Sequence, residues 1–245
     1  MRILTPFSLH LSKLPKNLKK NKHYFLINGI NGRMGRSLTS FISKQNNFEH
    51  IDYKEFVAST ADITPKNSAI IDFSQPSGLE EVLLNKYQLP LISGTTNLEK
   101  CHMELAQDYA LNAPIMLASN FSYGVQRLSF AIRAYLLKNP DIKECNITEV
   151  HHTEKKDAPS GTAKSLASEI SALIPDMEIN FLSLRKHNVF GLHSVSFLTA
   201  DKEVIFHHQA FNRDIFAEGA IAAALWLLEQ ENGLYGFENY FQNKL

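Results

Sequence analysis

The first half of the chain alternates between short apolar runs and apolar stripes at helical spacing. The runs lie at 23–28, 68–73, 89–93 and 114–118, and each has the length of a buried strand. Helical stripes follow two of these runs, one formed by Met34, Leu38, Phe41 and Ile42 and the other by Leu79, Val82 and Leu83. Strands that alternate with helices are typical of an α/β domain. We therefore expect a Rossmann-type parallel sheet.

The pattern changes after residue 120. A helical stripe at 125–136 precedes an alternating segment at 145–150, and a further helix is expected to end at Pro175. Three strand-type segments follow, around 179–184, 192–198 and 204–211. No helical period separates them, which predicts an α+β domain with a mostly antiparallel sheet. Residues 221–228 are strongly apolar and indicate a buried helix.

The turn after the first strand carries three glycines at the spacing G-x-x-G-x-x-G, over Gly29–Gly35. A strand, a glycine turn and a helix are the context of a dinucleotide-binding site, although a purely structural turn has the same appearance. The second strand of such a domain usually ends in an acid that binds ribose. We expect this strand at 55–62, with Asp62 as either the ribose contact or a turn residue. Lys54 and Lys66 are near, so the choice between NADH and NADPH stays open.

Composition excludes several classes of function. The chain has 25 Lys and Arg and 25 Asp and Glu, so no overall positive charge favours nucleic acid. Its two cysteines, Cys101 and Cys145, are too few for a disulfide framework or a cysteine zinc site and are consistent with a reducing compartment. No apolar run has the length of a membrane span. Residues 1–20 form a basic leader, which is a transit peptide, an ordered arm or an early translation start.

The largest group of potentially catalytic and ligand-binding residues lies between Glu149 and Thr162. Two histidines, His151 and His152, follow the strand at 145–150, and Lys155 and Asp157 come next. The helix that starts at Ser160-Gly161-Thr162 exposes backbone N–H groups and partial positive charge, which bind anions such as carboxylates. His152 and Lys155 add positive charge, and His151 or Lys155 is suited to proton transfer near neutral pH.

Less specific interpretations exist for the same stretch. Asp157 is expected to be a loop or capping carboxylate, and the whole segment has the composition of a capped helix after a solvated basic loop. A metal hydrolase built on His151 and His152 is disfavoured because adjacent histidines point different ways and no third ligand cluster is evident. We therefore expect no metal. His207 and His208, on opposite faces of a strand, are expected to be structural.

Residues 149–163 resemble the signature of the 4-hydroxy-tetrahydrodipicolinate reductases, formerly called dihydrodipicolinate reductases. The family pattern E-x-H-H-x-x-K-x-D-A-P-S-G-T-A matches from Glu149 to Ala163. Further similarities follow the family's order along the chain: G-R-M-G at 32–35, D-F-[ST]-x-P at 72–76, G-T-T at 94–96, N-F-S-x-G-V at 120–125 and G-A-x-x-A-A-x-W-L at 219–227.

The resemblance implies NAD(P)H-dependent reduction of 4-hydroxy-tetrahydrodipicolinate to tetrahydrodipicolinate with loss of water, a step toward diaminopimelate and lysine. It implies a Rossmann domain at 21–120 and 213–245, interrupted by a substrate-binding and oligomerisation domain at 121–212. It also implies a cytoplasmic homotetramer. Another two-domain NAD(P)-dependent dehydrogenase and a non-catalytic nucleotide sensor are the alternatives.

The resemblance also assigns roles to residues. His151 and Lys155 are expected to be catalytic, with Lys155 the first choice of general acid and His151 the second. The substrate is expected to contact His152, Ser160, Gly161, Thr162 and Thr96. The cofactor, NADH or NADPH, is expected to contact Gly29, Asn31, Gly32, Arg33, Met34, Gly94, Thr95, Thr96, Ser119, Asn120, Phe121, Ser122 and Arg213.

Overall fold

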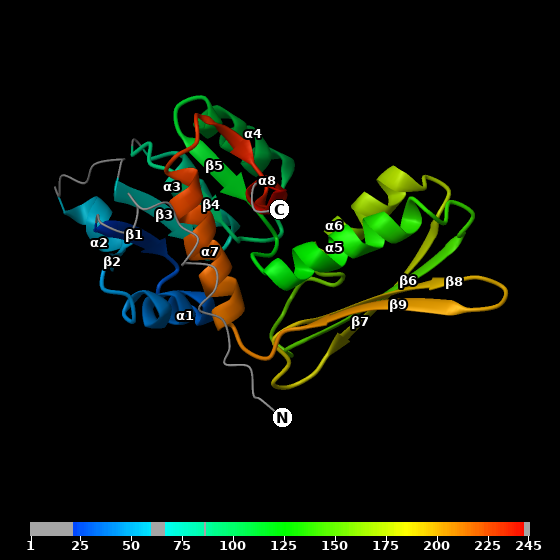
Figure 1. Ribbon diagram of the computed structural model, residues 1–245. Helices are drawn as coiled ribbons and strands as arrows, with labels where there is room; N and C mark the ends of the chain where they lie inside the picture. Colours follow the sequence, from blue (N-terminus) through cyan, green and yellow to red (C-terminus); the bar gives the residue numbers. More distant parts are fainter. Residues whose placement is uncertain (1–21, 60–66, 86, 243–245) are drawn as a thin grey trace. The chain divides into compact units, whose positions relative to one another are not determined.

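The computed structural model describes residues 22–59, 67–85 and 87–242 of the 245-residue chain (Figure 1). These residues form two compact units. Unit 1 takes in the described residues up to Ala118 together with Ala217–Tyr240, and unit 2 takes in Ser119–Phe216 and the described residues after Tyr240. The basic leader at 1–20 and Asp62 lie outside the described residues. No helix in the described part of the chain has the length and apolar character needed to cross a bilayer.

Unit 1 contains a six-stranded sheet in which every neighbouring pair is parallel, as the sequence predicted. The strand order is β10-β5-β4-β3-β1-β2. The strands are β1 (His23–Asn28), β2 (Phe48–Asp52), β3 (Ser68–Asp72), β4 (Leu91–Ser93), β5 (Pro114–Leu117) and β10 (Gly233–Tyr235). The chain passes from β2 at one edge to β3 on the far side of β1. The strand order therefore reverses between β1 and β3, which is where ligands of open α/β sheets bind.

Helices connect these strands and supply the core. They are α1 (Arg33–Ile42), α2 (Tyr53–Ala58), α3 (Pro76–Leu83), α4 (Lys100–Ala110), α7 (Asp214–Leu227) and α8 (Phe237–Gln242). One buried cluster packs Leu26 and Ile70 of the sheet against Leu79 of α3 and Ala106 of α4. Helix α7 is buried along most of its length, which explains why its sequence is apolar on every side.

The predicted second strand was wrong. Residues 55–58 belong to α2. The second strand is β2, which ends at Asp52, directly before α2 begins. Two features favour the helix: Asp52 accepts a hydrogen bond from the backbone N–H of Lys54 at 2.8 Å, and Tyr53 and Phe56 are buried at helical spacing. Strand β2 lies at the sheet edge and is only partly buried. Its weak apolar pattern gave no strand signal.

Unit 2 contains a mixed sheet of four strands in the order β7-β6-β8-β9. The strands are β6 (Glu144–His151), β7 (Glu178–Arg185), β8 (Leu192–Leu198) and β9 (Glu203–Gln209). Strands β6 and β7 are parallel and the other two pairs are antiparallel, which agrees with the predicted mostly antiparallel sheet. Helices α5 (Tyr123–Leu136) and α6 (Gly161–Leu173) lie on one face of this sheet (Figure 1).

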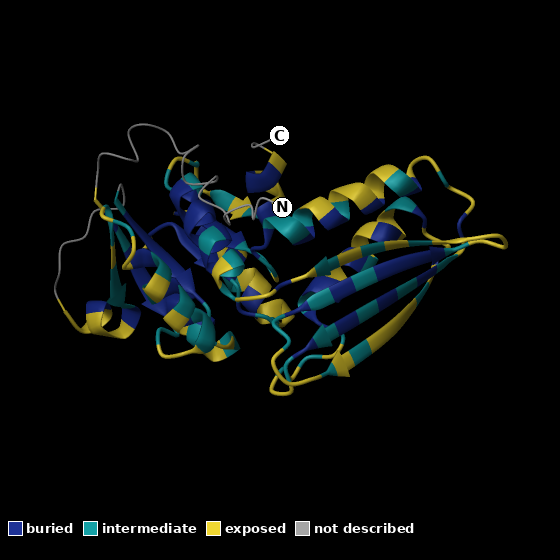
Figure 2. Cartoon of the chain, turned by 60° about the horizontal axis from the view of Figure 1, so that its bottom comes forward, coloured by how far each residue is buried: buried dark blue, intermediate teal, exposed yellow. Residues whose placement is uncertain are grey.

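The two faces of this sheet differ in burial. Along β6 every second residue is buried, and the buried row is Cys145, Ile147, Glu149 and His151 (Figure 2). Cys145 and Ile147 join the apolar core beneath α5 and α6. A glutamate and a histidine continue the same row, although buried charged groups are rare unless they are paired. This break in the apolar pattern marks the candidate site.

Candidate active site

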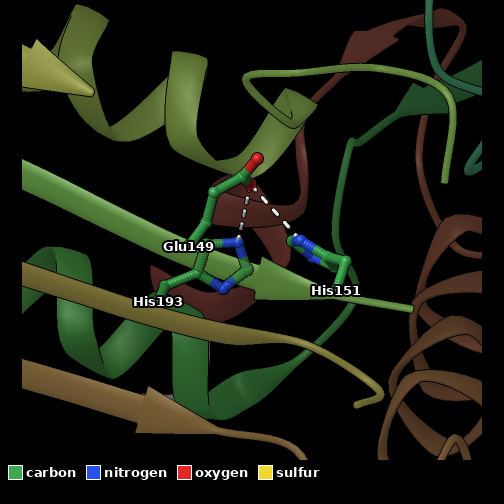
Figure 3. A group of neighbouring side chains, drawn as sticks. All are labelled: Glu149, His151 and His193. Carbon is green, nitrogen blue, oxygen red and sulfur yellow. Dashed lines mark ion pairs between the residues drawn. The ribbon is translucent and has the colours of Figure 1, made fainter. Parts of the chain in front are cut away.

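Four ionisable side chains meet on the buried face of the sheet in unit 2. Glu149 and His151 are alternate residues of β6 and therefore point the same way. The strand register places His193 of β8 opposite Glu149 and Arg185 of β7 opposite His151. Figure 3 shows the carboxylate of Glu149 directed toward both imidazole rings. Three strands thus build one polar cluster.

Glu149 is fully buried, and Arg185 balances its charge. Its Oε1 accepts hydrogen bonds from Nη1 and Nη2 of Arg185, at 3.3 and 3.2 Å, and from the backbone N–H of Ser160 at 3.0 Å. Burial alone would raise the pKa of Glu149, but hydrogen bonds from Ser160 and Ser183 and the neighbouring His151 outweigh it and lower the pKa. The carboxylate is therefore ionised at neutral pH.

The two histidines of the cluster are neutral at neutral pH. Nδ1 of His151 lies 3.4 Å from Oε2 of Glu149, and Nε2 of His193 lies 3.9 Å from the same oxygen. Burial lowers the pKa of His151 to about 4, although Glu149 acts to raise it. Burial, together with His151, lowers the pKa of His193 to about 3. Each ring therefore has a proton on only one of its two nitrogens.

Lys155 lies in the loop between β6 and α6. Its Nζ forms an ion pair with Oδ1 of Asp157 at 2.9 Å, while Oδ2 of Asp157 accepts a hydrogen bond from the N–H of Gly161 at 3.3 Å. Arg185 braces the loop by donating to the carbonyl groups of Lys155 and Asp157. Burial would raise the pKa of Asp157, but the hydrogen bond and the charge of Lys155 lower it. Asp157 therefore caps the helix, as expected, and also holds Lys155.

Side chains of the protein itself accept hydrogen bonds from some of the backbone N–H groups at the start of α6. Ser160 is the N-cap, and its Oγ accepts from the N–H of Ala163 at 3.2 Å. Only 1% of Ser160 is exposed. The Oγ1 of Thr162 accepts from Nδ2 of Asn120 at 3.1 Å. Ser160 thus orders the start of the helix from within. The roles of Ser160, Gly161 and Thr162 at the substrate stay a prediction.

The segment 119–122 organises the start of α5. Asn120 accepts from the N–H of Ser122 at 2.8 Å and donates to Thr162, so it joins the starts of α5 and α6. Ser122 is the N-cap of α5, and both Ser122 and Phe121 are buried. Ser119 is exposed and Asn120 is half-buried. The predicted contacts of these four residues with a cofactor stay a prediction.

In unit 1, the turn after β1 has no room for a side chain at Gly29 or at Gly35. Gly29 has a φ of +83°, and a Cβ there would lie 2.6 Å from the carbonyl oxygen of Phe73. A Cβ on Gly35 would lie 2.3 Å from the carbonyl oxygen of Gly29. Gly32, the N-cap of α1, makes no side-chain cap, and the first turn of α1 carries no acid. This helix start therefore keeps the anion-binding character that suits a pyrophosphate.

A cavity of about 410 Å³ lies beside this turn. Its walls come from the segments that follow β1, β2 and β3, and they include Asn31, Asp52, Lys54 and Ser74. Asp52 is the last residue of β2, where a Rossmann sheet places its ribose-binding acid. The structure therefore offers Asp52 for the role that the sequence analysis considered for Asp62.

Asp72 ties together the ends of three strands in unit 1. This fully buried carboxylate accepts hydrogen bonds from the side chains of Asn28 at 2.9 Å, Ser74 at 2.5 Å, Ser93 at 2.7 Å and Thr95 at 2.6 Å. These donors follow or end β1, β3 and β4. The side chain of Thr95 is therefore directed inward, and Asp72 fixes the turn that carries it.

Comparison with known proteins identifies the family. The N-terminal model of dihydrodipicolinate reductase matches residues 24–121, and the C-terminal model matches residues 125–241. The chain belongs to the dihydrodipicolinate reductase family. Two relatives named 4-hydroxy-tetrahydrodipicolinate reductase are 34% identical over 238 residues (Rickettsia bellii; 89% of this chain and 94% of the relative) and 35% identical over 237 residues (Campylobacter lari; 87% and 96%).

A solved dihydrodipicolinate reductase has the same fold. The dipicolinate-bound enzyme from Paenisporosarcina sp. TG-14 superposes with a TM-score of 0.60 and 20% sequence identity, over 89% of this chain and 99% of that one. It supports the two-part architecture of this family member, with a Rossmann-like sheet and a second mixed sheet.

Several residues of this dihydrodipicolinate reductase family member were missed or underrated by the sequence analysis. Arg185 and His193 belong to separate strands, and only the register of β7 and β8 with β6 brings them to Glu149. Asp52 was missed because β2 was not recognised. Asp72 was seen only as part of a motif. Arg213, expected to contact the cofactor, has its guanidinium 4.9 Å from the centre of the Phe190 ring.

A third candidate metal ligand lies close to Glu149 and His151. Glu149, His151 and His193 each offer one ligand atom within 4.8 Å of the others, so β8 supplies the third candidate ligand that the sequence did not reveal. His152 is not part of this group. Arg185 already pairs with Glu149, and Lys155 adds a second positive charge nearby. A divalent cation would therefore meet electrostatic repulsion, and the absence of a metal stays our prediction.

Proposed function

We propose that this chain is a 4-hydroxy-tetrahydrodipicolinate reductase, which uses NAD(P)H to reduce 4-hydroxy-tetrahydrodipicolinate to tetrahydrodipicolinate with loss of water in diaminopimelate and lysine biosynthesis. The observation that carries the proposal is the joint arrangement of His151, Lys155 and the start of α6 around the buried Glu149–Arg185 pair. It occurs in a chain that matches both halves of the reductase family.

The substrate is a dicarboxylate, and the loop after β6 has the character to bind one. Lys155 provides a cation on a side chain that Asp157 holds in place. Gly161 lets a ligand approach the backbone at the start of α6, where the helix dipole favours negative charge. We propose that Lys155, His152 and the Gly161-Thr162 segment bind the carboxylates. The role of Thr96 follows from the family resemblance alone.

The nucleotide fits unit 1. The turn at 29–35 has glycine at three positions, and the adjacent cavity of about 410 Å³ has a carboxylate, Asp52, at the end of β2. When bound, the nicotinamide supplies a hydride. We propose that Gly94 and Thr96 lie near the nicotinamide, because Asp72 holds their turn by its bond to Thr95.

Asp52 also bears on cofactor choice. A carboxylate at this position binds the ribose hydroxyls of NADH and repels the 2′-phosphate of NADPH. Lys54, two residues later, is exposed and lines the same cavity, so it offsets part of this repulsion. We propose that the enzyme accepts both nucleotides and favours NADH.

The overall reaction consumes one proton, and Lys155 is the proposed donor. Its ammonium group has a proton to give at neutral pH, whereas burial keeps His151 neutral by lowering its pKa to about 4. Asp157 orients Lys155 through their ion pair. Proton transfer from a positioned side chain typically contributes roughly 10²–10⁴-fold to the rate.

A coupled assay tests the proposed function. The preceding synthase would generate the substrate in place from aspartate semialdehyde and pyruvate, and oxidation of NADH and of NADPH would be followed separately by absorbance. Substrate-dependent oxidation of either nucleotide supports the proposal. Nucleotide binding without oxidation would favour a sensor or a different dehydrogenase. A ratio of specificity constants that favours NADPH would contradict the role given to Asp52.

We also propose that unit 2 forms a homotetramer through the open face of its sheet. This face exposes Leu182, Leu184 and Ile205, which are 53%, 45% and 56% exposed. Light scattering during gel filtration would give the mass, and one chain has 27.7 kDa. Leu182→Lys is expected to reduce the mass of the assembly, whereas Leu137→Lys, at a 64% exposed leucine that caps the end of α5, is expected to leave it unchanged.

A cytoplasmic location completes the proposal. The two cysteines, Cys101 and Cys145, are free thiols, as a reducing compartment favours. Cell fractionation with an antibody to the chain would test the location, and recovery of the chain in an oxidising compartment would contradict it.

A further inference from the structure

The carboxylate of Glu149 is satisfied on one oxygen and not on the other. Oε1 accepts from Arg185 and from the backbone of Ser160. Oε2 is fully buried and makes no hydrogen bond with any described residue. A buried acceptor without a donor destabilises the fold. Two ring nitrogens face it, Nδ1 of His151 at 3.4 Å and Nε2 of His193 at 3.9 Å.

The surroundings of His193 decide between the two rings. Its Nε2 lies 3.4 Å from Oγ of Ser160. That oxygen also accepts from the N–H of Ala163. At 3.9 Å, Nε2 of His193 lies beyond hydrogen-bond distance of Oε2, whereas Nδ1 of His151 at 3.4 Å lies within it. His151 remains as the donor to Oε2.

A neutral imidazole carries one N–H, so a proton on Nδ1 leaves a lone pair on Nε2. Nε2 of His151 lies beside Gly191, where an added Cβ would be 3.5 Å away. The nitrogen with the lone pair is therefore not covered by a side chain of residue 191. It is suited to accept a hydrogen bond from a substrate or from a protonated amine.

We infer that Glu149 is a positioning residue that holds His151 in the tautomer with its proton on Nδ1 and its lone pair on Nε2. The inference rests on the proposed function for its consequence: His151 accepts and orients, and the proton that the reaction consumes comes from Lys155. Arg185 supports the same arrangement. Its hydrogen bonds to Oε1 keep Oε2 of Glu149 directed at the imidazole of His151.

The first test needs neither substrate nor cofactor. The protein would be labelled with ¹⁵N-histidine, and long-range ¹H–¹⁵N correlation spectra would report which ring nitrogen of His151 carries the proton at pH 7.5. The signals of His151 would be assigned by their loss in His151→Gln. We expect a proton on Nδ1 and none on Nε2. A proton on Nε2, or on both nitrogens, would overturn the inference.

The second test reverses the tautomer. In Glu149→Gln, Arg185 and Ser160 still require an acceptor, so the amide oxygen takes the place of Oε1 and the amide NH₂ faces His151. His151 is then expected to carry its proton on Nε2. Loss of the correct tautomer, or of acid–base catalysis, lowers the rates of other enzymes by roughly 10²–10⁴-fold. We expect kcat to fall by a similar factor, with little change in KM for the nucleotide.

Glu144→Gln is the matched control, because Glu144 is a partly buried glutamate at the other end of the same strand. It should keep both the tautomer and kcat. A Glu149→Gln enzyme with unchanged kcat, or with an unchanged tautomer, would refute the positioning role. If Glu149→Gln does not fold, the spectrum of the wild-type protein decides. A wild-type protein with the expected tautomer but no substrate-dependent oxidation would remove the proposed function and leave the tautomer assignment intact.

Discussion

Acidification from pH 7.5 to pH 5 is expected to destabilise unit 2 through His151 and His193. Both rings are buried and neutral in the folded chain, with pKa values of about 4 and about 3. In the unfolded chain each has the ordinary value of 6.5. Between pH 6.5 and pH 4 the unfolded state therefore binds more protons than the folded state. Stability rises with pH across this window and is lost as the pH falls.

The size of the effect follows from the unfolded state. At pH 5 both folded rings remain neutral, because each folded pKa lies below 5, so the loss depends on the unfolded pKa alone. That value is about 1.5 units above pH 5, and at 1.36 kcal/mol per unit each ring costs about 2 kcal/mol. The two rings together are expected to lower the free energy of unfolding by about 4 kcal/mol. Glu149 and Asp157 add little at pH 5, because their ordinary pKa values already lie below 5 and the fold lowers them further.

Hydrogen exchange measured by mass spectrometry gives the opening free energy of β6 and β8 directly. It would be compared at pH 7.5 and pH 5 at one protein concentration, after correction for intrinsic exchange rates. His193→Phe should remove about 2 kcal/mol of the pH-dependent loss. His207→Gln, at an exposed histidine of β9, should remove none. Equal opening free energies at the two pH values, or an equal effect of both variants, would refute the reasoning.

Three further predictions concern single substitutions. Lys155→Ala should lower kcat by roughly 10²–10⁴-fold in the coupled assay, the usual size of a general-acid contribution; turnover like that of the wild type would remove Lys155 from this role. Asp52→Asn, which keeps a capping side chain for α2, should shift the ratio of specificity constants toward NADPH by about tenfold, or about 1.4 kcal/mol. Glu81→Gln, at another carboxylate that lines the cavity, should not shift it. Asp72→Asn should destabilise unit 1 by about 1–3 kcal/mol, measured by thermal unfolding through Trp226 fluorescence; an unchanged midpoint would contradict its role in joining the strands.

Much of the fold could be predicted from the sequence because its periodicities were strong. The continuous apolar run of β3 gave a buried strand, and the alternation of β6 gave a strand with one buried face. The nearly uniform apolar character of α7 gave a buried helix. Strand β2 was not predicted, because an edge strand of mixed polarity has no such pattern. The N-cap signal of Asp52 was also not used.

The site was predictable only where its residues are close in sequence. His151, Lys155 and Asp157 lie in one motif, so their types and spacing indicated chemistry. Arg185 and His193 reach Glu149 through strand register, which is a property of the folded sheet. Local pattern also could not tell that Ser160 would be used inside the unit, because capping and ligand binding favour the same residue type at a helix start.

The interrupted course of unit 1 has a consequence for synthesis on the ribosome. Unit 2 is built almost entirely from one continuous segment, Ser119–Phe216, whereas unit 1 needs both α7 and β10 from the end of the chain. Until Gly233–Tyr235 emerges, β5 is an unpaired sheet edge in the nascent chain. The part of the protein that begins first is thus completed last, and a chain cut short before β10 would contain Glu149, His151, Arg185 and His193 but would lack one strand of the sheet in unit 1.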